Sequence, residues 1–431
     1  MRNSHKFAAR MLVSIVLPCA TFACSGSDDT AVDKQPSGQI EIFSWWVSGG
    51  EVDALNAVLD LNQEKYPKTK VKNLTEDLAD EARQRLEQRM AQGAPPDTFQ
   101  ANVGADLFKW VLFNGVDDKE SKVEPLNAIA EANGWFDVFP KSVTDALSHN
   151  GSFYGVPANI HRLNSLFYNT KLFEREGLTP PDTRDELLTV SKALKAKGYV
   201  PLCIGSDHWW TLSLLAFENI FPSVAGGDYY LGYWTGKKTP DSAQVNAALD
   251  YLEELWPYFN EDANSLDWTT GIDHMFDSTN PCAMTVMGDW AKGYLEKKGW
   301  EAGTDFAQIP FPGSRGTFVF TADTFPLPKG APNRPGAVAL LETFASVEGQ
   351  IAFNRIKGSI PVRTDIDPKE FDSIAQKTMA DFTKDQLVSA MSGLLPQDSF
   401  GDLGPALKEM LSSGDREGVL NALANDYAML K

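Results

Sequence analysis

Strand-like and helix-like segments alternate along most of the chain, and this alternation restricts the fold more than any other feature. Apolar side chains at every second position give residues 40–46 strand character, and residues 52–66 carry apolar side chains at helical spacing. Extended runs separated by helical segments recur further along, at 71–74, 200–203 and 282–287. This order predicts a parallel α/β architecture and not a helical bundle or an all-β sandwich.

The length and charge of the chain restrict its organisation and its partners. A chain of 431 residues is too long for one hydrophobic core, so we expect two domains or one discontinuous pair of domains. The 58 Asp and Glu residues against 39 Lys and Arg residues give a formal charge of -19. Such a surface opposes binding to phosphate backbones and to anionic lipids, so nucleic acid is not an expected partner.

The first residues have the pattern of an export signal. A basic start precedes an apolar run from Met11 to Ala23, which is too short to span a bilayer as a helix. Cys24 follows a small residue and precedes a polar stretch, as in bacterial lipoprotein signals. We therefore expect a signal peptide at 1–23 and a lipid-anchored linker at 24–38. The mature protein would then lie at the periplasmic or extracellular face of the cell membrane.

The four cysteines leave two alternatives open. Thr21 stands where lipoprotein signals usually have Leu, so a plain cleaved signal peptide remains the alternative to lipid attachment at Cys24. Cys19 would leave with the signal, and Cys203 and Cys282 remain in the folded part, either as a disulfide or as two buried thiols. No Cys or His cluster has zinc spacing, so we expect no metal and no cofactor.

Five short segments form a recognisable set, spread over nearly the whole chain after the linker: Phe43–Glu51 (FSWWVSGGE), Val156–Arg162 (VPANIHR), Met287–Tyr294 (MGDWAKGY), Leu327–Gly330 (LPKG) and Lys357–Arg363 (KGSIPVR). Together and in this order they resemble the extracellular solute-binding proteins (family 1) of carbohydrate ABC importers, closest to the glucose-binding branch. The resemblance implies a two-lobed periplasmic-binding-protein fold of type II, similar to maltodextrin-binding proteins, with the ligand cleft between the lobes. The first lobe would comprise 39–156 and 307–362, and the second 157–306 and 363–431. More than one connection between lobes favours hinge closure.

A pyranose needs a flat aromatic surface for its apolar face and charged or amide groups for its hydroxyls. The resemblance assigns stacking to Trp45, Trp46 and Trp268. Adjacent strand residues point to opposite faces, so one of Trp45 and Trp46 in the core, with the other capping the sheet, fits the residues as well. Trp268 also fits a hydrophobic anchor of the second lobe.

The resemblance assigns the sugar hydroxyls to Glu51, Asp289 and Lys329. Glu51 begins the first helix, where the helix dipole also favours an acid. Asp289 follows an apolar strand, at the edge where open α/β sheets bind ligands. By their residue types alone, Asp289 also fits a helix cap and Lys329 an exposed lysine.

Two further candidates depart from the family pattern. Asn102 stands where some relatives carry His, and its amide offers fixed donors and an acceptor without titrating. Ser392 stands where glucose-binding relatives tend to have His, and its short side chain reaches only a different hydroxyl or a water. His161 is a lower-ranked candidate, because a hydrogen-bonded structural histidine near the hinge explains it equally well.

The expected function is capture of a monosaccharide, such as glucose or a related hexose, for the permease of an ABC importer. The protein is expected to be a monomer and not an enzyme. A sugar-presenting sensor for chemotaxis or signalling would have the same cleft and remains an alternative. A secreted glycoside hydrolase would need two carboxylates flanking a scissile bond, for which Glu51 and Asp289 are the candidates. The chain lacks the Gly-x-Ser-x-Gly and His-Glu-x-x-His motifs of common hydrolases.

Overall fold

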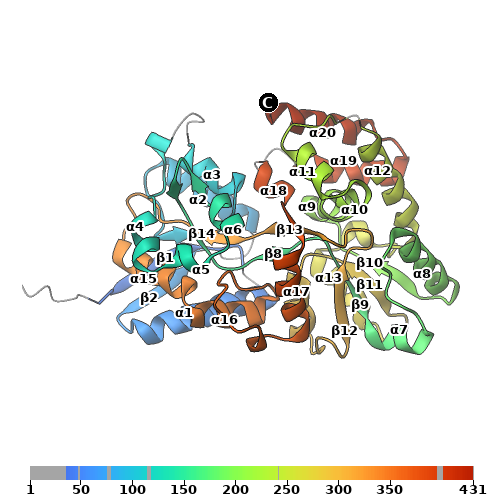
Figure 1. Cartoon of the computed structure of the whole chain (residues 1–431), viewed down its shortest axis with the longest axis horizontal. Helices are drawn as coiled ribbons and strands as arrows, with labels where there is room; N and C mark the ends of the chain where they lie inside the picture. Colours follow the sequence, from blue (N-terminus) through green and yellow to red (C-terminus); the bar gives the residue numbers. More distant parts are fainter. Residues whose placement is uncertain are drawn as a thin grey trace, which may run out of the picture. The chain divides into compact units, whose positions relative to one another are not determined.

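Two sheets joined by crossing strands organise the chain (Figure 1). The computed structural model describes residues 35–46, 49–74, 79–113, 118–240, 242–395 and 401–430. The expected signal peptide, Cys24 and the linker up to residue 34 lie outside the described residues, and so do the predictions made for them.

The first sheet is parallel, as the alternation predicts. Its central strand β1 (Gly38–Phe43) pairs with β2 (Thr69–Asn73) on one side and β3 (Thr98–Phe99) on the other. The connections between these strands are α1 (Gly49–Lys65) and α2 (Ala79–Ala91). The buried side chains of α1 recur at helical spacing, so the helix packs one face against the core.

The second sheet is mixed, which differs from the parallel arrangement expected. Its strand order is β10 (Val200–Cys203), β11 (Cys282–Val286), β9 (Ser165–Asn169) and β12 (Phe306–Pro310). The β10 and β11 strands are parallel, whereas β9 runs antiparallel to both its neighbours. Only Leu163 and Asn164 separate β9 from the preceding strand, so no crossover helix sets its direction.

Short strands cross between the two sheets. One set has the order β15 (Gln386–Ser389), β13 (Thr317–Thr321) and β8 (His161–Arg162). The other has the order β4 (Ala101–Asn102), β14 (Asp323–Phe325) and β7 (Val156–Pro157). Figure 1 shows β13 and β14 running through the middle of the view, between the sheet of β1 and the sheet of β9.

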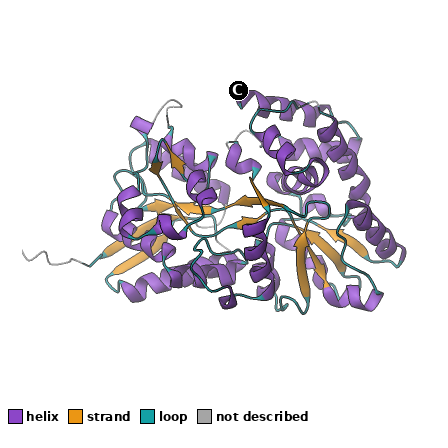
Figure 2. Ribbon diagram, viewed as in Figure 1, coloured by secondary structure: helices purple, strands orange, loops and turns teal. Residues whose placement is uncertain are grey.

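Helices surround the strands (Figure 2). Those near the first sheet and the crossing strands are α3 (Ala105–Val111), α4 (Asn127–Ala132), α5 (Trp135–Val138), α6 (Lys141–Ala146), α15 (Arg334–Ala345), α16 (Val347–Lys357) and α17 (Ser373–Lys384). The others are α7 (Thr170–Glu176), α8 (Arg184–Ala196), α9 (Trp209–Ser213), α10 (Phe221–Ala225), α11 (Gly227–Trp234), α12 (Ala243–Leu255), α13 (Trp268–Asp273), α14 (Trp290–Lys297), α18 (Met391–Leu394), α19 (Leu403–Ser413) and α20 (Glu417–Met429). The short strands β5 (Ser148–His149) and β6 (Ser152–Phe153) form an antiparallel hairpin.

The buried apolar side chains form two large cores. The first core takes residues from 40–160 and from 318–382, and the second takes residues mainly from 163–311 and 388–423. The β12 strand belongs to the sheet of the second core, and Ala375 and Phe382 of α17 pack in the first core. The lobe bounds expected from the sequence remain a prediction.

A disulfide ties two strands of the second sheet together. Cys203, the last residue of β10, is bonded to Cys282, the first residue of β11, with the two Cα atoms 6.0 Å apart. Both side chains are fully buried. The structure therefore has the disulfide and not the pair of thiols.

None of the helices in the described part of the chain combines the length and the apolar character that crossing a membrane requires.

One buried carboxylate gives a prediction for stability. Asp426 on α20 is 1 % exposed, and neither of its carboxylate oxygens has a hydrogen-bond partner. Burial, with a smaller effect from the charge of Asp402, raises the pKa of Asp426 to about 7. Because the folded-state pKa lies above the value of the unfolded chain, ionising this group opposes folding increasingly as the pH rises from about 4 through 7.

We therefore expect Asp426→Asn to stabilise the protein at pH 8 by about 2 to 4 kcal/mol and to change little at pH 4. Urea unfolding at both pH values measures the difference. The exposed Asp60 on α1 supplies the control variant, Asp60→Asn, which should leave the pH dependence unchanged. An equal effect of Asp426→Asn at pH 4 and pH 8 would contradict this account.

Candidate functional site

A buried ammonium group lies where the two cores meet. Lys357 ends α16, and its side chain is 2 % exposed. Its Nζ atom lies 2.6 Å from Oε1 of Glu51 and 5.5 Å from the ring centroid of Trp46. The ring centroid of Trp290, which packs against the second core, lies 5.6 Å from the same Nζ atom. The ammonium of Lys357 thus contacts the carboxylate of Glu51 and lies near two indole rings, one beside each core.

A close backbone approach brings these groups together. Gly358 follows Lys357 with φ at +92°, and a Cβ atom there would lie 2.7 Å from the carbonyl oxygen of Asp289 and from the nitrogen of Gly293. Only glycine fits both the conformation and the space. The end of α16 therefore meets the beginning of α14, which places Lys357 beside Trp290.

The imidazole of His161 lies beside this cluster, between two carboxylates. Its Nδ1 atom is hydrogen-bonded to Oδ1 of Asp289, and its Nε2 atom lies 3.0 Å from Oδ2 of Asp323. His161 is 2 % exposed. Burial lowers the pKa of His161, but the two carboxylates outweigh burial, and the net shift is upward.

The carboxylate of Asp289 is fully buried and already engaged. Its Oδ2 atom accepts a hydrogen bond from the backbone N–H of Arg162 at 2.9 Å, and Oδ1 faces His161. Asp289 occupies the N-cap position of α14, but its side chain makes no capping hydrogen bond there. The side chain therefore holds the crossing strand β8 and does not cap the helix.

Asp323 lies at the start of β14 and is 4 % exposed. Its Oδ1 atom accepts from Nε2 of Gln100 at 2.8 Å, and its Oδ2 atom accepts from Nδ2 of Asn159 at 2.8 Å. Burial raises the pKa of Asp323, but hydrogen bonding and attraction from His161 outweigh burial and lower it overall. Asp323 therefore carries negative charge beside the histidine.

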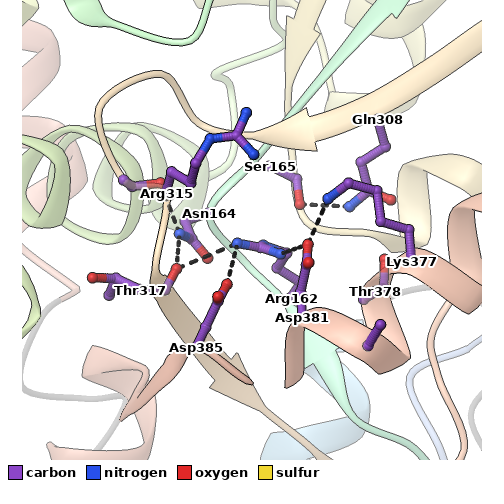
Figure 3. A network of polar contacts seen from close by, with 12 residues as sticks. Arg162, Asn164, Ser165, Gln308, Arg315, Thr317, Lys377, Thr378, Asp381 and Asp385 are labelled. Atoms are coloured by element: carbon purple, nitrogen blue, oxygen red, sulfur yellow. Dashed lines mark hydrogen bonds and ion pairs between the residues drawn. The ribbon is translucent and has the colours of Figure 1, made fainter. Parts of the chain in front are cut away.

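A second polar network fixes the other end of β8 (Figure 3). The guanidinium of Arg162 is 2.9 Å from Oδ2 of Asp381 on α17 and donates to the carbonyl oxygen of Thr317 at 3.3 Å. Nδ2 of Asn164 donates to the same carbonyl oxygen at 2.8 Å. Figure 3 shows Asp385 beside the same guanidinium. The crossing strands are thus held together by charge and not by apolar packing alone.

Asn102 and Ser392 flank a second point where the two parts of the fold meet. A Cβ atom on Gly104, whose φ is +81°, would lie 2.1 Å from the carbonyl oxygen of Gly393. Asn102 precedes Gly104 by two residues and Ser392 precedes Gly393 by one, and both side chains are half-buried. The structure therefore brings the segments that carry these two predicted residues into contact.

Glu218 anchors the segment that carries Ser392. It lies in a π-helix (Leu214–Ile220), and its Oε1 atom accepts from the backbone N–H of Met391 at 3.0 Å. Burial raises the pKa of Glu218 to about 8. A buried carboxyl group therefore holds α18 in place.

Trp46 and Trp45, both predicted to stack on the sugar, differ in their burial. Trp46 is 1 % exposed and packs with Phe325 and Phe353 in the first core. Trp45 is half-buried and lies 4.3 Å under the guanidinium of Arg83 on α2. Both indoles lie beyond β1, which ends at Phe43 and not at 46 as expected, and both pack against the first core, Trp46 within it and Trp45 at its edge.

Trp268 and Lys329 occupy the periphery. Trp268 begins α13 and packs edge-on against Tyr294, with centroids 5.5 Å apart. Tyr294 in turn lies close to Gly49 at the start of α1, which carries Glu51. Lys329 is exposed, and its backbone N–H donates to Lys122. Trp268 is therefore near the cluster, and Lys329 does not take part in its hydrogen bonds.

Three members of the cluster were missed by reasoning from the sequence: Trp290, Asp323 and Lys357. Trp290 and Lys357 belong to two of the recognised segments, 287–294 and 357–363, so those segments were a signal that could have identified them. No comparable sequence signal marks Asp323. Among the described residues, no group of three or more His, Cys, Asp and Glu side chains is arranged to hold a metal ion.

Comparison with known proteins adds an independent observation. A family model described as "Bacterial extracellular solute-binding protein" matches residues 48–351. An uncharacterized ABC transporter extracellular-binding protein of Pyrococcus horikoshii is 28 % identical over 445 residues, covering 98 % of this chain and 97 % of that protein.

A xylose/arabinose-binding protein of Haloferax volcanii is 28 % identical over 360 residues, covering 80 % of this chain and 74 % of that protein. Among solved structures, the bacterial solute receptor AcbH, reported to prefer β-D-galactopyranose, superimposes with a TM-score of 0.78 at 17 % identity. The match covers 91 % of this chain and 98 % of that one. The structural match establishes the two-lobed α/β fold.

Proposed function

The chain belongs to the bacterial extracellular solute-binding protein family, and from this membership we propose that it binds a monosaccharide, glucose or a related hexose, for an ABC importer. The relative from Haloferax volcanii is named for binding the monosaccharides xylose and arabinose, which supports a single pyranose as the ligand. The protein acts by binding and release, and no step of this cycle requires a covalent bond to form or break.

The observation that carries the proposal is the Lys357 cluster. A sugar needs aromatic surface beside charged hydrogen-bonding groups, and here Lys357 and Glu51 lie beside the indoles of Trp46 and Trp290. Each hydrogen bond between a charged group and a hydroxyl contributes about 1.5 to 3 kcal/mol net. Two or three of them with stacking on one indole supply the roughly 8 kcal/mol that micromolar binding requires.

Access to the cluster requires the two lobes to separate. Trp46 and Lys357 are almost fully buried in the described arrangement, so a ligand reaches them only when α14 moves away from α16. A sugar that contacts both lobes then stabilises the closed state through its higher affinity for it. In this cycle Glu51, Lys357 and Trp290 contact the sugar.

The other expected residues complete the proposed site. Asn102 and Ser392 contact hydroxyls from opposite lobes, and Trp268 lines the edge near Tyr294. Trp45 and Lys329 stay sequence-based predictions, to be tested by substitution. We further propose that Cys24 is lipidated, which holds a monomeric protein near the permease.

Calorimetric titration with a panel of hexoses, pentoses and disaccharides tests the function. We expect at least one hexose to bind with a Kd of about 1 to 10 μM. If only disaccharides or longer sugars give heat, the ligand class is an oligosaccharide and the monosaccharide proposal is wrong. If no sugar in the panel binds, the sugar-binding proposal itself is wrong.

A further inference from the structure

His161 connects two carboxylates that belong to different parts of the fold. Asp289 stands at the beginning of α14, beside the second core, and Asp323 begins β14, which pairs with β4 beside the first core. His161 lies on β8, one of the strands that cross between them. Any change at this imidazole therefore acts on both sides of the crossing strands.

A carboxylate at each ring nitrogen favours a proton on both of them. A neutral imidazole has one N–H group and one lone pair, whereas an imidazolium donates from both nitrogens. Nδ1 faces Asp289 and Nε2 faces Asp323 at 3.0 Å, and both partners are carboxylates. With a neutral ring, one carboxylate would face a lone pair in a site with almost no water contact.

The amide of Asn159 lies beside both Asp323 and the Nε2 atom of His161. Its Oδ1 atom accepts from the backbone N–H of Asp323 at 2.8 Å, which fixes the orientation of the amide. Its Nδ2 atom donates to Oδ2 of Asp323 at 2.8 Å. The same Nδ2 atom lies 2.9 Å from Nε2 of His161, and its second hydrogen is one that an unprotonated Nε2 would accept, so this amide opposes a proton on Nε2.

Other charged groups near the ring partly oppose its proton. The ammonium of Lys357 lowers the pKa of His161, but this ammonium is itself neutralised by Glu51. The ring edge of Trp290 packs against the imidazole at 5.2 Å between centroids. With burial included, the two carboxylates still raise the pKa of His161 above its ordinary value of 6.5.

We propose that His161 is an imidazolium at neutral pH and is a positioning residue of the sugar site, holding Asp289 and Asp323 so that Trp290 and Lys357 meet. This inference rests on the proposed function. The proton is most strongly bound in the closed arrangement, where both carboxylates are in place. Loss of the proton at high pH therefore favours separation of the two lobes and weakens the binding of the sugar.

The test is the pH dependence of sugar affinity between pH 6 and pH 9.5. For the unchanged protein we expect the affinity of the bound hexose to fall about tenfold over this range. His161→Gln keeps a donor and an acceptor but cannot carry the charge, so it should bind weakly and with a flat pH profile. His274, 30 % exposed and 3.2 Å from the single carboxylate of Asp262, supplies the control variant His274→Gln, which should behave like the unchanged protein.

A second measurement tests the proton without a ligand. Nitrogen-15 spectra of the histidine rings at pH 7.5 should show one imidazolium with both nitrogens protonated, absent in His161→Gln. A neutral tautomer for His161, or a pH profile that His161→Gln leaves unchanged, overturns the inference. Failure of every sugar to bind at any pH refutes the proposed function instead, and the spectra still decide the charge of the ring.

Discussion

The Lys357→Met variant is expected to bind its sugar about 100-fold more weakly than the unchanged protein, while remaining folded. Methionine keeps the length of the side chain and its packing beside the indoles but removes the ammonium group. The variant loses one charge-assisted hydrogen bond to the sugar and leaves Glu51 without its partner, together about 3 kcal/mol. Calorimetry measures the affinity, and the melting temperature shows whether the protein is folded.

Lys329→Met is the matched comparison, because the resemblance assigns the same role to an exposed lysine. The structure gives Lys329 no place in the cluster, so this variant should bind within about twofold of the unchanged protein. A large loss from Lys329→Met with none from Lys357→Met would move the site away from the cluster and contradict the account.

Removing the disulfide is expected to destabilise the protein by about 4 kcal/mol. Cys203 and Cys282 are 79 residues apart in the sequence, and closing a loop of this length restricts the unfolded chain by that amount in the chain-entropy model. The two residues lie in paired strands, so the backbone hydrogen bonds between β10 and β11 should hold the native backbone in place when both are replaced by Ala. Urea unfolding of the Cys203→Ala, Cys282→Ala double variant measures the loss.

The same comparison can be made without substitution. Unfolding of the unchanged protein in a reducing buffer should approach the stability of the double variant, and the double variant should not respond to the reductant. A double variant as stable as the oxidised protein would mean that the bond does not restrain the unfolded chain.

Local periodicity predicts the elements of the first sheet because each is determined by nearby residues. The helix expected at 52–66 is α1 (Gly49–Lys65), and the strand expected at 71–74 is β2 (Thr69–Asn73). The direction of β9 is different, since it depends on the crossing strand that precedes it. A pattern of apolar residues contains no information about that direction.

The site shows the same limit. Glu51 and Lys357 are 306 residues apart, and no local pattern reveals that their side chains meet. In the segment 287–294 the sequence predicts that Asp289 binds the sugar. In the structure Asp289 is hydrogen-bonded to His161 and Arg162, and the neighbouring Trp290 lies beside the ammonium of Lys357. Three of the five segments recognised in the sequence contribute to the Lys357 cluster, whereas the contacts of each residue within them depend on the packing of the two cores.

The proposed site is best tested by a crystal structure with the tightest-binding sugar of the panel. We expect density for a single pyranose in contact with Lys357, Glu51 and the ring of Trp290, with Asn102 and Ser392 reaching it from opposite lobes. A sugar bound elsewhere, for instance over Trp45 and Arg83, with the Lys357 cluster still closed on itself, would contradict the proposed site.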